Sequence, residues 1–219
     1  MHRFIALAWN AKDAERTAVA MDISARIRAK LTTWPVAFKA DGLRVVHSGT
    51  HTRASRAYAL DGDAGVILGT LFRRGAEDNP IEDGALGARE TGLILKTNGR
   101  HLTMAYWGRY VGFLHEESRG KVIVFRDPSG AFPCFTIRHC GIDIFFSRVE
   151  DLCSLGCFSF PVNWEYVASH LLFDQLRSRT TGLEGVLEIL PGECVETDGE
   201  SKSESFHWHP APFCRDDQI

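Results

Sequence analysis

The chain has 219 residues, of which 44% are hydrophobic and 11% are aromatic, so it can bury a full core. Its net charge of −3 is spread along the sequence without a basic stripe, which argues against a nucleic-acid partner. No segment approaches the roughly 20 apolar residues of a membrane-spanning helix. The short apolar run at residues 4–9 lacks the small-residue cleavage site of a signal peptide. We therefore expect a soluble, cytoplasmic protein.

The amino-terminal part of the chain predicts one strand, one helix and two hairpins. Residues 4–9 read as a buried strand, and Val19, Ile23, Ile27 and Leu31 then recur at the spacing of one helical stripe. Turn dipeptides such as Asp41-Gly42 tolerate the positive φ angles of a tight hairpin. The expected hairpin strands are residues 34–39 with 43–48, and residues 56–60 with 65–72.

The middle of the chain predicts an exposed loop, a helix and an antiparallel meander. Residues 73–87 are rich in turn-forming and charged residues and lead into a helix near residues 86–97, which Asn98-Gly99 can close. Short turns separate the next apolar runs. These four expected strands are residues 110–115, 121–126, 134–139 and 142–147.

The last part of the chain predicts a helix that Asn163 caps, an apolar segment at 183–190, a turn at Pro191-Gly192 and a short strand at 193–196. From Thr197 onward the composition becomes polar, as in a linker. The sequence thus predicts one domain over residues 1–196 and a linker over 197–219. Strands without a regular βαβ alternation indicate an α+β fold.

The six cysteines predict buried or reduced thiols, because their spacing is irregular and the chain is large enough to fold without disulfides. We predict no metal site. His207 and His209 flank a tryptophan without a further ligand at suitable spacing. The aromatic run from Tyr106 through Trp107 to Tyr110 is interpreted as core packing, with sugar or base stacking as the alternative.

One motif carries a resemblance to a known family. Strand 121–126 ends in Arg126-Asp127-x-x-Gly130-x-x-Pro133, and a hairpin and Ser147 follow it. This order resembles the class II glutamine amidotransferase domains of asparagine synthetases. Segments 108–113, 187–192 and 206–210 resemble further stretches of these domains in the same order. In physical terms the motif shapes a turn between two core strands and has no catalytic chemistry of its own.

The resemblance implies an N-terminal-nucleophile hydrolase fold, a four-layer αββα sandwich of two antiparallel sheets. Members with glutaminase activity use a Cys that removal of the initiator Met exposes, because its free α-amine serves as general base. This chain has His2 there, and its first cysteine is Cys134. We therefore predict no catalytic residue.

The glutamine-binding residues of the family also differ here. The family places Asn-Gly-Glu after a core strand to stabilise the oxyanion, whereas this chain has Leu68-Gly69-Thr70. Only Gly69 remains. Glu90 aligns loosely with the acidic residue that receives the substrate amino group, so Gly69 and Glu90 are the candidate remnants of a degenerate site. An arginine at position 53 or 56 is a weaker candidate for the substrate carboxylate.

The chain also lacks the Ser-Gly-Gly-x-Asp-Ser loop with which the family's synthetase domain holds ATP. We expect no cofactor on this chain, and ATP and Mg²⁺ only in a synthetase domain in cis or on a separate chain. The leading hypothesis is a non-catalytic domain of a carbon–nitrogen ligase, as in β-lactam synthetases and the cyclases of lasso-peptide biosynthesis, with a peptide as a candidate substrate. The alternatives are a glutamine-hydrolysing asparagine synthase and a stand-alone binding or regulatory module.

Overall fold

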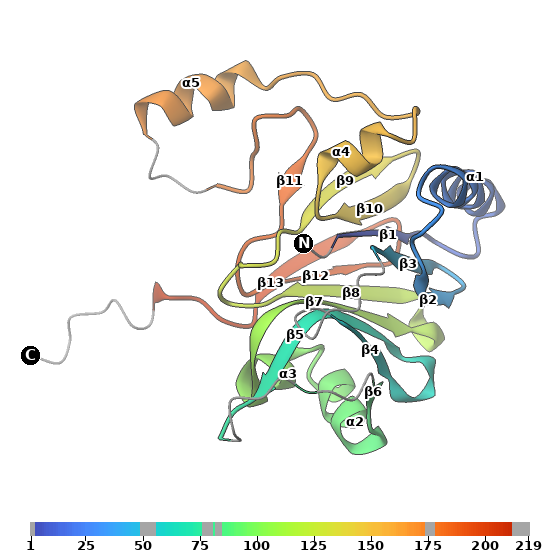
Figure 1. The fold of residues 1–219 in the computed structure, drawn as a ribbon, viewed down its shortest axis with the longest axis vertical. Coiled ribbons are helices and arrows are strands. Elements are labelled where there is room, and N and C mark those ends of the chain that lie inside the picture. Colours follow the sequence, from blue (N-terminus) through green and yellow to red (C-terminus); the bar gives the residue numbers. More distant parts are fainter. Residues whose placement is uncertain (1–2, 49–55, 76–80, 82–84, 174–177, 212–219) are drawn as a thin grey trace, which may run out of the picture.

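The computed structural model describes residues 3–48, 56–75, 81, 85–173 and 178–211. These residues form two antiparallel β-sheets that face each other, with helices on both outer faces (Figure 1). The only parallel pair among the described strands is the short contact between β4 and β6. This arrangement confirms the predicted α+β sandwich.

The first sheet has β1 at its centre. Its strand order is β11-β9-β10-β1-β3-β2, and every neighbouring pair is antiparallel. β1 is buried on both faces because it lies between the core and a layer of helices. The strands are β1 (Phe4–Ala8), β2 (Val36–Ala40), β3 (Leu43–His47), β9 (Phe135–His139), β10 (Ile142–Phe146) and β11 (Leu187–Glu188).

The second sheet has the order β13-β12-β8-β7-β5-β4-β6. β5 and β7 are long and pair along their whole shared length, from Gly65 opposite Leu114 to Arg73 opposite Tyr106. The strands are β4 (Arg56–Leu60), β5 (Gly65–Arg73), β6 (Ala85–Leu86), β7 (Tyr106–Glu116), β8 (Lys121–Arg126), β12 (Glu193–Thr197) and β13 (Lys202–Phe206).

Short caps and turns fix where the helices begin. Asp13 caps α1 by accepting hydrogen bonds from the backbone amides of Glu15 and Arg16, and Asn163 caps α5 by accepting one from the amide of Tyr166. Gly99, with φ of 93°, separates α2 from α3. The helices are α1 (Ala14–Lys30), α2 (Ala88–Lys96), α3 (Arg100–Ala105), α4 (Val149–Cys153) and α5 (Trp164–Leu172), with short 3₁₀ turns η1 (Asp61–Asp63) and η2 (Glu117–Arg119).

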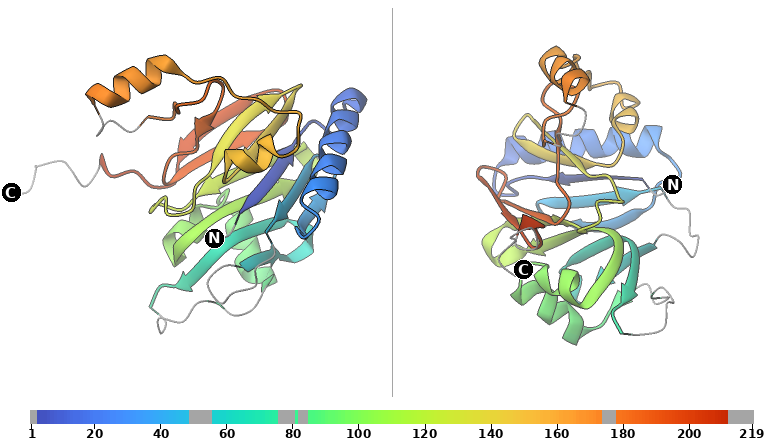
Figure 2. Two further views of the ribbon diagram at one scale, coloured as in Figure 1. Left: turned by 45° about the horizontal axis from the view of Figure 1, so that its top comes forward. Right: turned by 90° about the vertical axis from the view of Figure 1, so that its left-hand side faces the viewer.

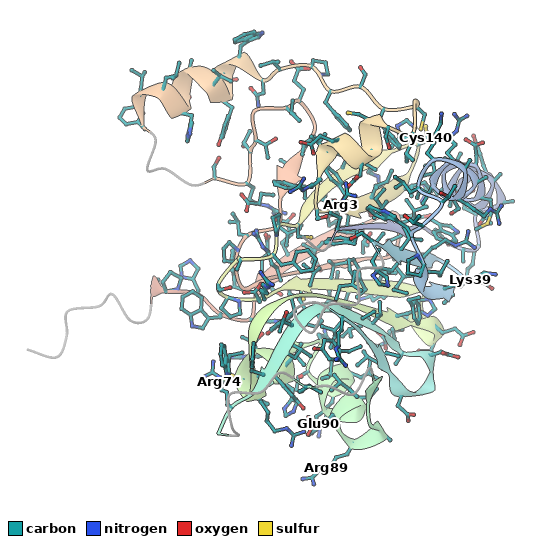
Figure 3. The ribbon with its side chains drawn as sticks, viewed as in Figure 1. Arg3, Lys39, Arg74, Arg89, Glu90 and Cys140 are labelled. Atoms are coloured by element: carbon teal, nitrogen blue, oxygen red, sulfur yellow. The ribbon has the colours of Figure 1, made fainter. Side chains whose placement is uncertain are left out.

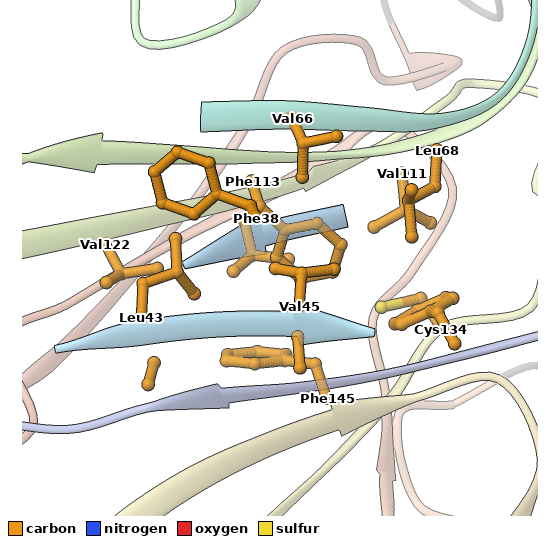
Figure 4. Packing of buried hydrophobic residues seen from close by; sticks show 14 of the residues in the cluster. Phe38, Leu43, Val45, Val66, Leu68, Val111, Phe113, Val122, Cys134 and Phe145 are labelled. Atoms are coloured by element: carbon orange, nitrogen blue, oxygen red, sulfur yellow. The ribbon is translucent and has the colours of Figure 1, made fainter. Parts of the chain in front are cut away.

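Alternating side chains of each strand supply three apolar layers. From β1, Phe4 and Ala6 point between the sheets, whereas Ile5 and Leu7 point toward α1 and α4. From β5, Leu68 joins the layer between the sheets, whereas Ile67 and Leu71 pack under α2 and α3. Figure 4 shows the layer between the sheets, and Figure 2 shows α1 and α4 on one side of the sandwich with α2 and α3 on the other. The predicted four-layer order is therefore confirmed.

Three segments differ from the sequence predictions. Helix α3 occupies residues that the pattern left between helix and strand, and β7 begins at Tyr106 instead of residue 110. The polar stretch predicted to be linker contains β13, which pairs with β12 from Lys202 to Phe206. Edge strands tolerate polar residues because one of their sides faces solvent, so composition alone does not reveal β13.

The aromatic run at the start of β7 is only partly core. Tyr106 and Tyr110 are fully buried, as predicted, but Trp107 is 46% exposed. It stacks on Phe72 of the neighbouring strand, with ring centroids 4.2 Å apart. The prediction of core packing is wrong for Trp107, because β5 and β7 extend past the layer that covers their middle. No helix in the described part of the chain is long and apolar enough to cross a membrane.

Candidate functional site

The start of β1 is the corner to which the resemblance assigns the nucleophile. His2 lies outside the described residues, so the structure begins here at Arg3. The Arg3 amide donates to the Ser48 hydroxyl at 2.9 Å, and the Phe4 amide donates to the Ser147 hydroxyl at 3.0 Å. Ser48 follows β3 and Ser147 follows β10, so the two strands that flank β1 each supply one hydroxyl. Together they fix the backbone immediately after position 2.

A buried carboxylate lies beside this corner. Asp151 in α4 is 2.8 Å from the Arg3 guanidinium, and burial raises the pKa of this carboxyl group although the charge of Arg3 opposes that shift. The Arg3 guanidinium also lies over the Trp34 ring, 5.4 Å from its centroid. The second carboxylate oxygen of Asp151 is buried and has no hydrogen-bond partner among the described residues. The corner is thus held by one ion pair and two serine hydroxyls. Sequence reasoning noted Ser147 but missed Ser48 and Asp151, which no local pattern marks.

A cavity of about 350 Å³ opens next to Ser147. Its wall is largely apolar and includes Phe135, Phe146 and Leu183, while Arg148 and Glu150 line it with charged side chains. Small-molecule sites combine an apolar wall with a few polar groups in this way. The cavity suits an apolar group better than the small polar side chain of glutamine.

Gly69 serves the packing of the sheet. It lies in β5 with φ of 133°, and a Cβ atom there would stand 2.1 Å from the Arg109 carbonyl oxygen on β7. Only glycine tolerates this approach of two strands. Its neighbour Leu68 is fully buried in the layer between the sheets, where Figure 4 shows it beside Val111 of the adjacent strand. Position 68 therefore has no side-chain hydrogen-bond donor.

Glu90 lies on the other side of the second sheet, in α2. One carboxylate oxygen is 3.3 Å from Arg73 Nη2 and the other is 3.1 Å from His101 Nε2. Burial works to raise the pKa of Glu90, but hydrogen bonds from His101 and Tyr106 and the charge of Arg73 outweigh it and lower the pKa. These three partners occupy the carboxylate oxygens of Glu90, which a substrate ammonium would need.

The structure does not bring Glu90 and Gly69 together. Glu90 binds Arg73, at the end of β5, and Gly69 lies four residues earlier, roughly 13 Å away along an extended strand. Glu90 and Arg3 are also far apart, because Figure 3 shows Arg3 in the layer of the first sheet and Glu90 below the second. The two candidate remnants therefore do not share a pocket.

The turn after β8 is built around Arg126, whose side chain is only 4% exposed. Its guanidinium donates to the carbonyl oxygens of Phe132, Gly130 and Ile189 at 2.8, 2.5 and 2.5 Å, and to Glu188 at 2.6 Å. One side chain thus ties the turn before Pro133 to the segment that contains β11. Such a set of bonds positions backbone and uses four of the five donors of the guanidinium.

Asp127 organises the same turn from within. Its carboxylate accepts hydrogen bonds from the amides of Tyr110, Ser129 and Gly130, and from the Ser129 hydroxyl. Burial raises the pKa of Asp127 although these bonds oppose the shift. Gly130, at φ of 62°, leaves no room for a side chain because a Cβ would lie 2.6 Å from the Pro191 ring. The four motif residues are therefore the frame of a turn.

The cysteines divide into buried and exposed thiols. Burial raises the pKa of Cys134 and of Cys194 to about 12, which suppresses the thiolate form. Cys140 and Cys153 are exposed, and the described cysteines are all free. Cys134 faces the core between the sheets (Figure 4), so it is not placed to act as a nucleophile.

Comparison with solved structures finds low similarity to larger enzymes. One is described as the allosteric regulatory enzyme of purine biosynthesis: its TM-score is 0.46 at 12% identity, over 94% of this chain and 43% of that one. Another is a glutamine phosphoribosylpyrophosphate amidotransferase from B. subtilis, complexed with ADP and GMP. It has a TM-score of 0.46 at 11% identity, over 95% of this chain and 49% of that one. The chain spans less than half of the length of these structures.

A search of protein-family models finds no match. A search of curated proteins also finds none.

Proposed function

We propose that this chain is a non-catalytic, glutaminase-like domain of an asparagine-synthase-related enzyme that forms amide bonds with ATP, of the macrolactam or β-lactam cyclase type. The observation that carries the proposal is Leu68, which is fully buried where the resemblance places an oxyanion-binding asparagine. A buried leucine offers no hydrogen bond to a developing negative charge. His2 in place of the nucleophilic cysteine supports the same conclusion.

A further argument for the proposal is that the structural turn at Arg126 is fully formed, whereas the candidate substrate-binding residues are not available to a ligand. Arg126 and Asp127 satisfy a dense set of backbone groups, and Gly130 fits a turn that no larger residue could occupy. Glu90, the candidate for binding a substrate amino group, is engaged by its own neighbours Arg73 and His101. A cyclase that uses a substrate amine does not require ammonia, so its glutaminase-like domain can lose catalytic groups while the frame is kept.

The catalytic chemistry then belongs to a synthetase domain, in cis or on a separate chain. That domain would bind ATP and Mg²⁺ and activate a carboxylate, with a peptide as the candidate substrate. We place the assembly in the cytoplasm. A Ser-Gly-Gly-x-Asp-Ser loop encoded downstream or in an adjacent frame would support this arrangement and contradict a stand-alone binding module.

The test is glutamine hydrolysis by the purified chain, followed as glutamate release. We expect no turnover above background in the wild type, in His2→Cys or in the matched control His2→Ala, since a new thiol still lacks an oxyanion site beside Leu68. Wild-type turnover that His2→Ala abolishes would overturn the proposal and favour a glutamine-hydrolysing asparagine synthase. Turnover in His2→Cys alone would show that the pocket retains its substrate-binding groups.

A further inference from the structure

The cavity next to Ser147 lies on the outer face of the first sheet. Its floor is formed by Phe135 of β9 and Phe146 of β10, which are paired in the sheet and have ring centroids 5.9 Å apart. Both rings belong to the apolar layer under α1 and α4, whereas Leu68 lies in the layer between the sheets. The cavity is therefore on the other side of the first sheet from the region where the resemblance places glutamine.

Two short segments form the side walls of the cavity. One is the start of α4, with Val149, and the other is the segment between α5 and β11, with Leu183 and Val186. Figure 1 shows this segment next to α4. The large side chains of both walls belong to the same apolar cluster as the floor. A ligand in the cavity would thus meet apolar surface on three sides.

Hydrogen bonds hold both walls in place. The Thr181 hydroxyl donates to the Val186 carbonyl at 2.9 Å and accepts from the Leu183 amide at 3.2 Å, which fixes the segment before β11. On the other side, Ser147 is tied to Phe4 of β1 by two bonds, one from each backbone amide. The cavity therefore exists before a ligand enters, and binding does not have to order its walls.

The polar groups of the cavity favour an uncharged ligand. Arg148 and Glu150 are the charged residues of the wall, and both are exposed to solvent. Their charges are opposite, so together they select neither an anion nor a cation. An ionised group would also lose its hydration against the apolar wall. The Ser147 hydroxyl accepts from the Phe4 amide and retains one hydrogen to donate, which allows for one polar substituent on the ligand.

The volume of the cavity sets the size of the ligand. An apolar cavity of about 150 Å³ holds one benzene molecule, and small-molecule sites in proteins measure about 300–1,000 Å³. The volume here is about 350 Å³. Scaling from benzene gives roughly 14 non-hydrogen atoms as the upper limit for a ligand that fills it. Two or three fused rings have this size, and flat rings pack well against the aromatic floor.

We propose that this cavity is a binding site for an uncharged, largely apolar small molecule of two or three fused rings, which lies on Phe135 and Phe146 between Val149 and Leu183. This proposal does not depend on the role proposed above, because neither Leu68 nor Glu90 contributes to the cavity wall.

The first test titrates 2-naphthol, a neutral two-ring probe, into the wild-type chain by isothermal titration calorimetry. We expect one site with a dissociation constant below about 1 mM. The one-ring probe phenol should bind at least about 10-fold more weakly, because it leaves more of the apolar wall uncovered. Absence of 2-naphthol binding in this range, or equal affinity for phenol, would overturn the proposal.

A variant that fills the cavity tests the location. Val149→Phe adds a ring at the wall and should raise the dissociation constant for 2-naphthol at least about 10-fold. Val36→Phe is the matched control, since Val36 is 57% exposed on β2, at the opposite edge of the first sheet from β11. Trp164→Ala removes the exposed ring of α5, and both control variants should bind as the wild type does. Equal weakening in Val149→Phe and Val36→Phe, or loss of binding in Trp164→Ala, would contradict the assignment to this cavity.

A second measurement uses the wild type and so does not depend on the folding of a variant. In protein labelled at its leucine and valine methyl groups, nuclear Overhauser effects should connect bound 2-naphthol with Leu183 and Val186. Contacts with the exposed Leu171 and Leu172 of α5 instead would refute the proposal.

A blocked Gly-Trp-Gly peptide is the comparison probe for a polypeptide ligand. We expect it to bind at least about 10-fold more weakly than 2-naphthol, because its backbone amides would lose hydration at the apolar wall. A chain that binds this peptide at Leu183 and Val186 but does not bind 2-naphthol would overturn the proposal, and would identify the cavity as an anchor for an aromatic side chain of another polypeptide.

Discussion

The hydroxyl of Thr197 donates a 2.6 Å hydrogen bond to the carboxylate of Asp143, and this bond joins the two sheets. Thr197 lies in β12 of the second sheet and Asp143 in β10 of the first, and both are buried. Lys202 and Arg138 place their charged groups 3.3 and 3.5 Å from the same carboxylate. A buried charge is tolerated when it is paired and hydrogen-bonded in this way.

Replacing Thr197 with valine should lower the free energy of unfolding by about 1.5–3 kcal/mol, the range for a hydrogen bond to a charged group. The substitution keeps the shape of the side chain but removes the donor to Asp143 and the acceptor of the Gly199 amide. Urea unfolding measures the change. Thr180→Val, at an exposed position, is the control and should have little effect. Equal losses in both variants would show that the contact between the sheets is not important for stability.

Removal of the Arg126 side chain should be more damaging. Arg126→Ala leaves the carbonyl groups of Phe132 and Ile189 without their donor, and we expect a loss of about 3–5 kcal/mol. Arg126→Lys should be intermediate, because an ammonium cannot reproduce the planar fork of donors. The comparison is Arg119→Ala, since the Arg119 side chain is 68% exposed. A loss in Arg126→Ala no larger than in that control would refute the central role of this guanidinium.

His207 should make stability depend on pH. Burial lowers its pKa from 6.5 to about 4, and the charge of Arg100 adds to the effect. The unfolded chain therefore binds a proton at higher pH than the folded one does, so stability is retained above pH 6.5 and falls as the pH drops toward 4. Allowing for partial exposure, the loss is about 2 kcal/mol.

The variant His207→Gln isolates this contribution. Wild type and variant are unfolded by urea at a series of pH values, and the difference between them is plotted. We expect the wild type to lose stability more steeply than the variant between pH 6.5 and 4. Parallel curves would mean that His207 is solvated in the folded protein.

Thiol labelling should follow the burial of the cysteines. At pH 8 a thiol with a pKa of about 12 has about one part in ten thousand as thiolate, so Cys134 and Cys194 should react at least about 100-fold more slowly than Cys140 and Cys153. Mass spectrometry after a timed pulse of N-ethylmaleimide locates the labels. Unfolding in urea should remove the difference. Rapid labelling of Cys134 in the native protein would reopen the search for a nucleophile.

Local patterns predicted those elements whose signal is contained in neighbouring residues. The stripe that includes Ile23 and Ile27 identified α1, and both side chains are buried against the first sheet. Gly99 closes α2 as expected from the preference of glycine for positive φ. The motif at Arg126 was correctly assigned to a turn, because its residues have few other conformations available.

Contacts between distant segments were not predictable in the same way. The pattern Ile142-Asp143-Ile144 gives no sign that Asp143 points inward, because its partners Thr197 and Lys202 come from a hairpin more than 50 residues later. The exposure of Trp164, Leu171 and Leu172 in α5 is equally hidden, since their spacing along one helical face alone would predict burial. In both cases the deciding interaction lies outside the segment that the sequence pattern describes.

The central position of β1 has a consequence for synthesis of the chain. β1 needs β10 as its neighbour, and the bond from Phe4 to Ser147 spans 143 residues. At roughly 5–20 residues per second, a ribosome needs about 7–30 s to make that length. During this interval one edge of an entirely apolar strand has no native partner, which is the situation in which nascent chains aggregate or recruit chaperones. β1 thus emerges long before its pairing is completed, and the yield of folded protein should depend on how β1 is protected until β10 arrives.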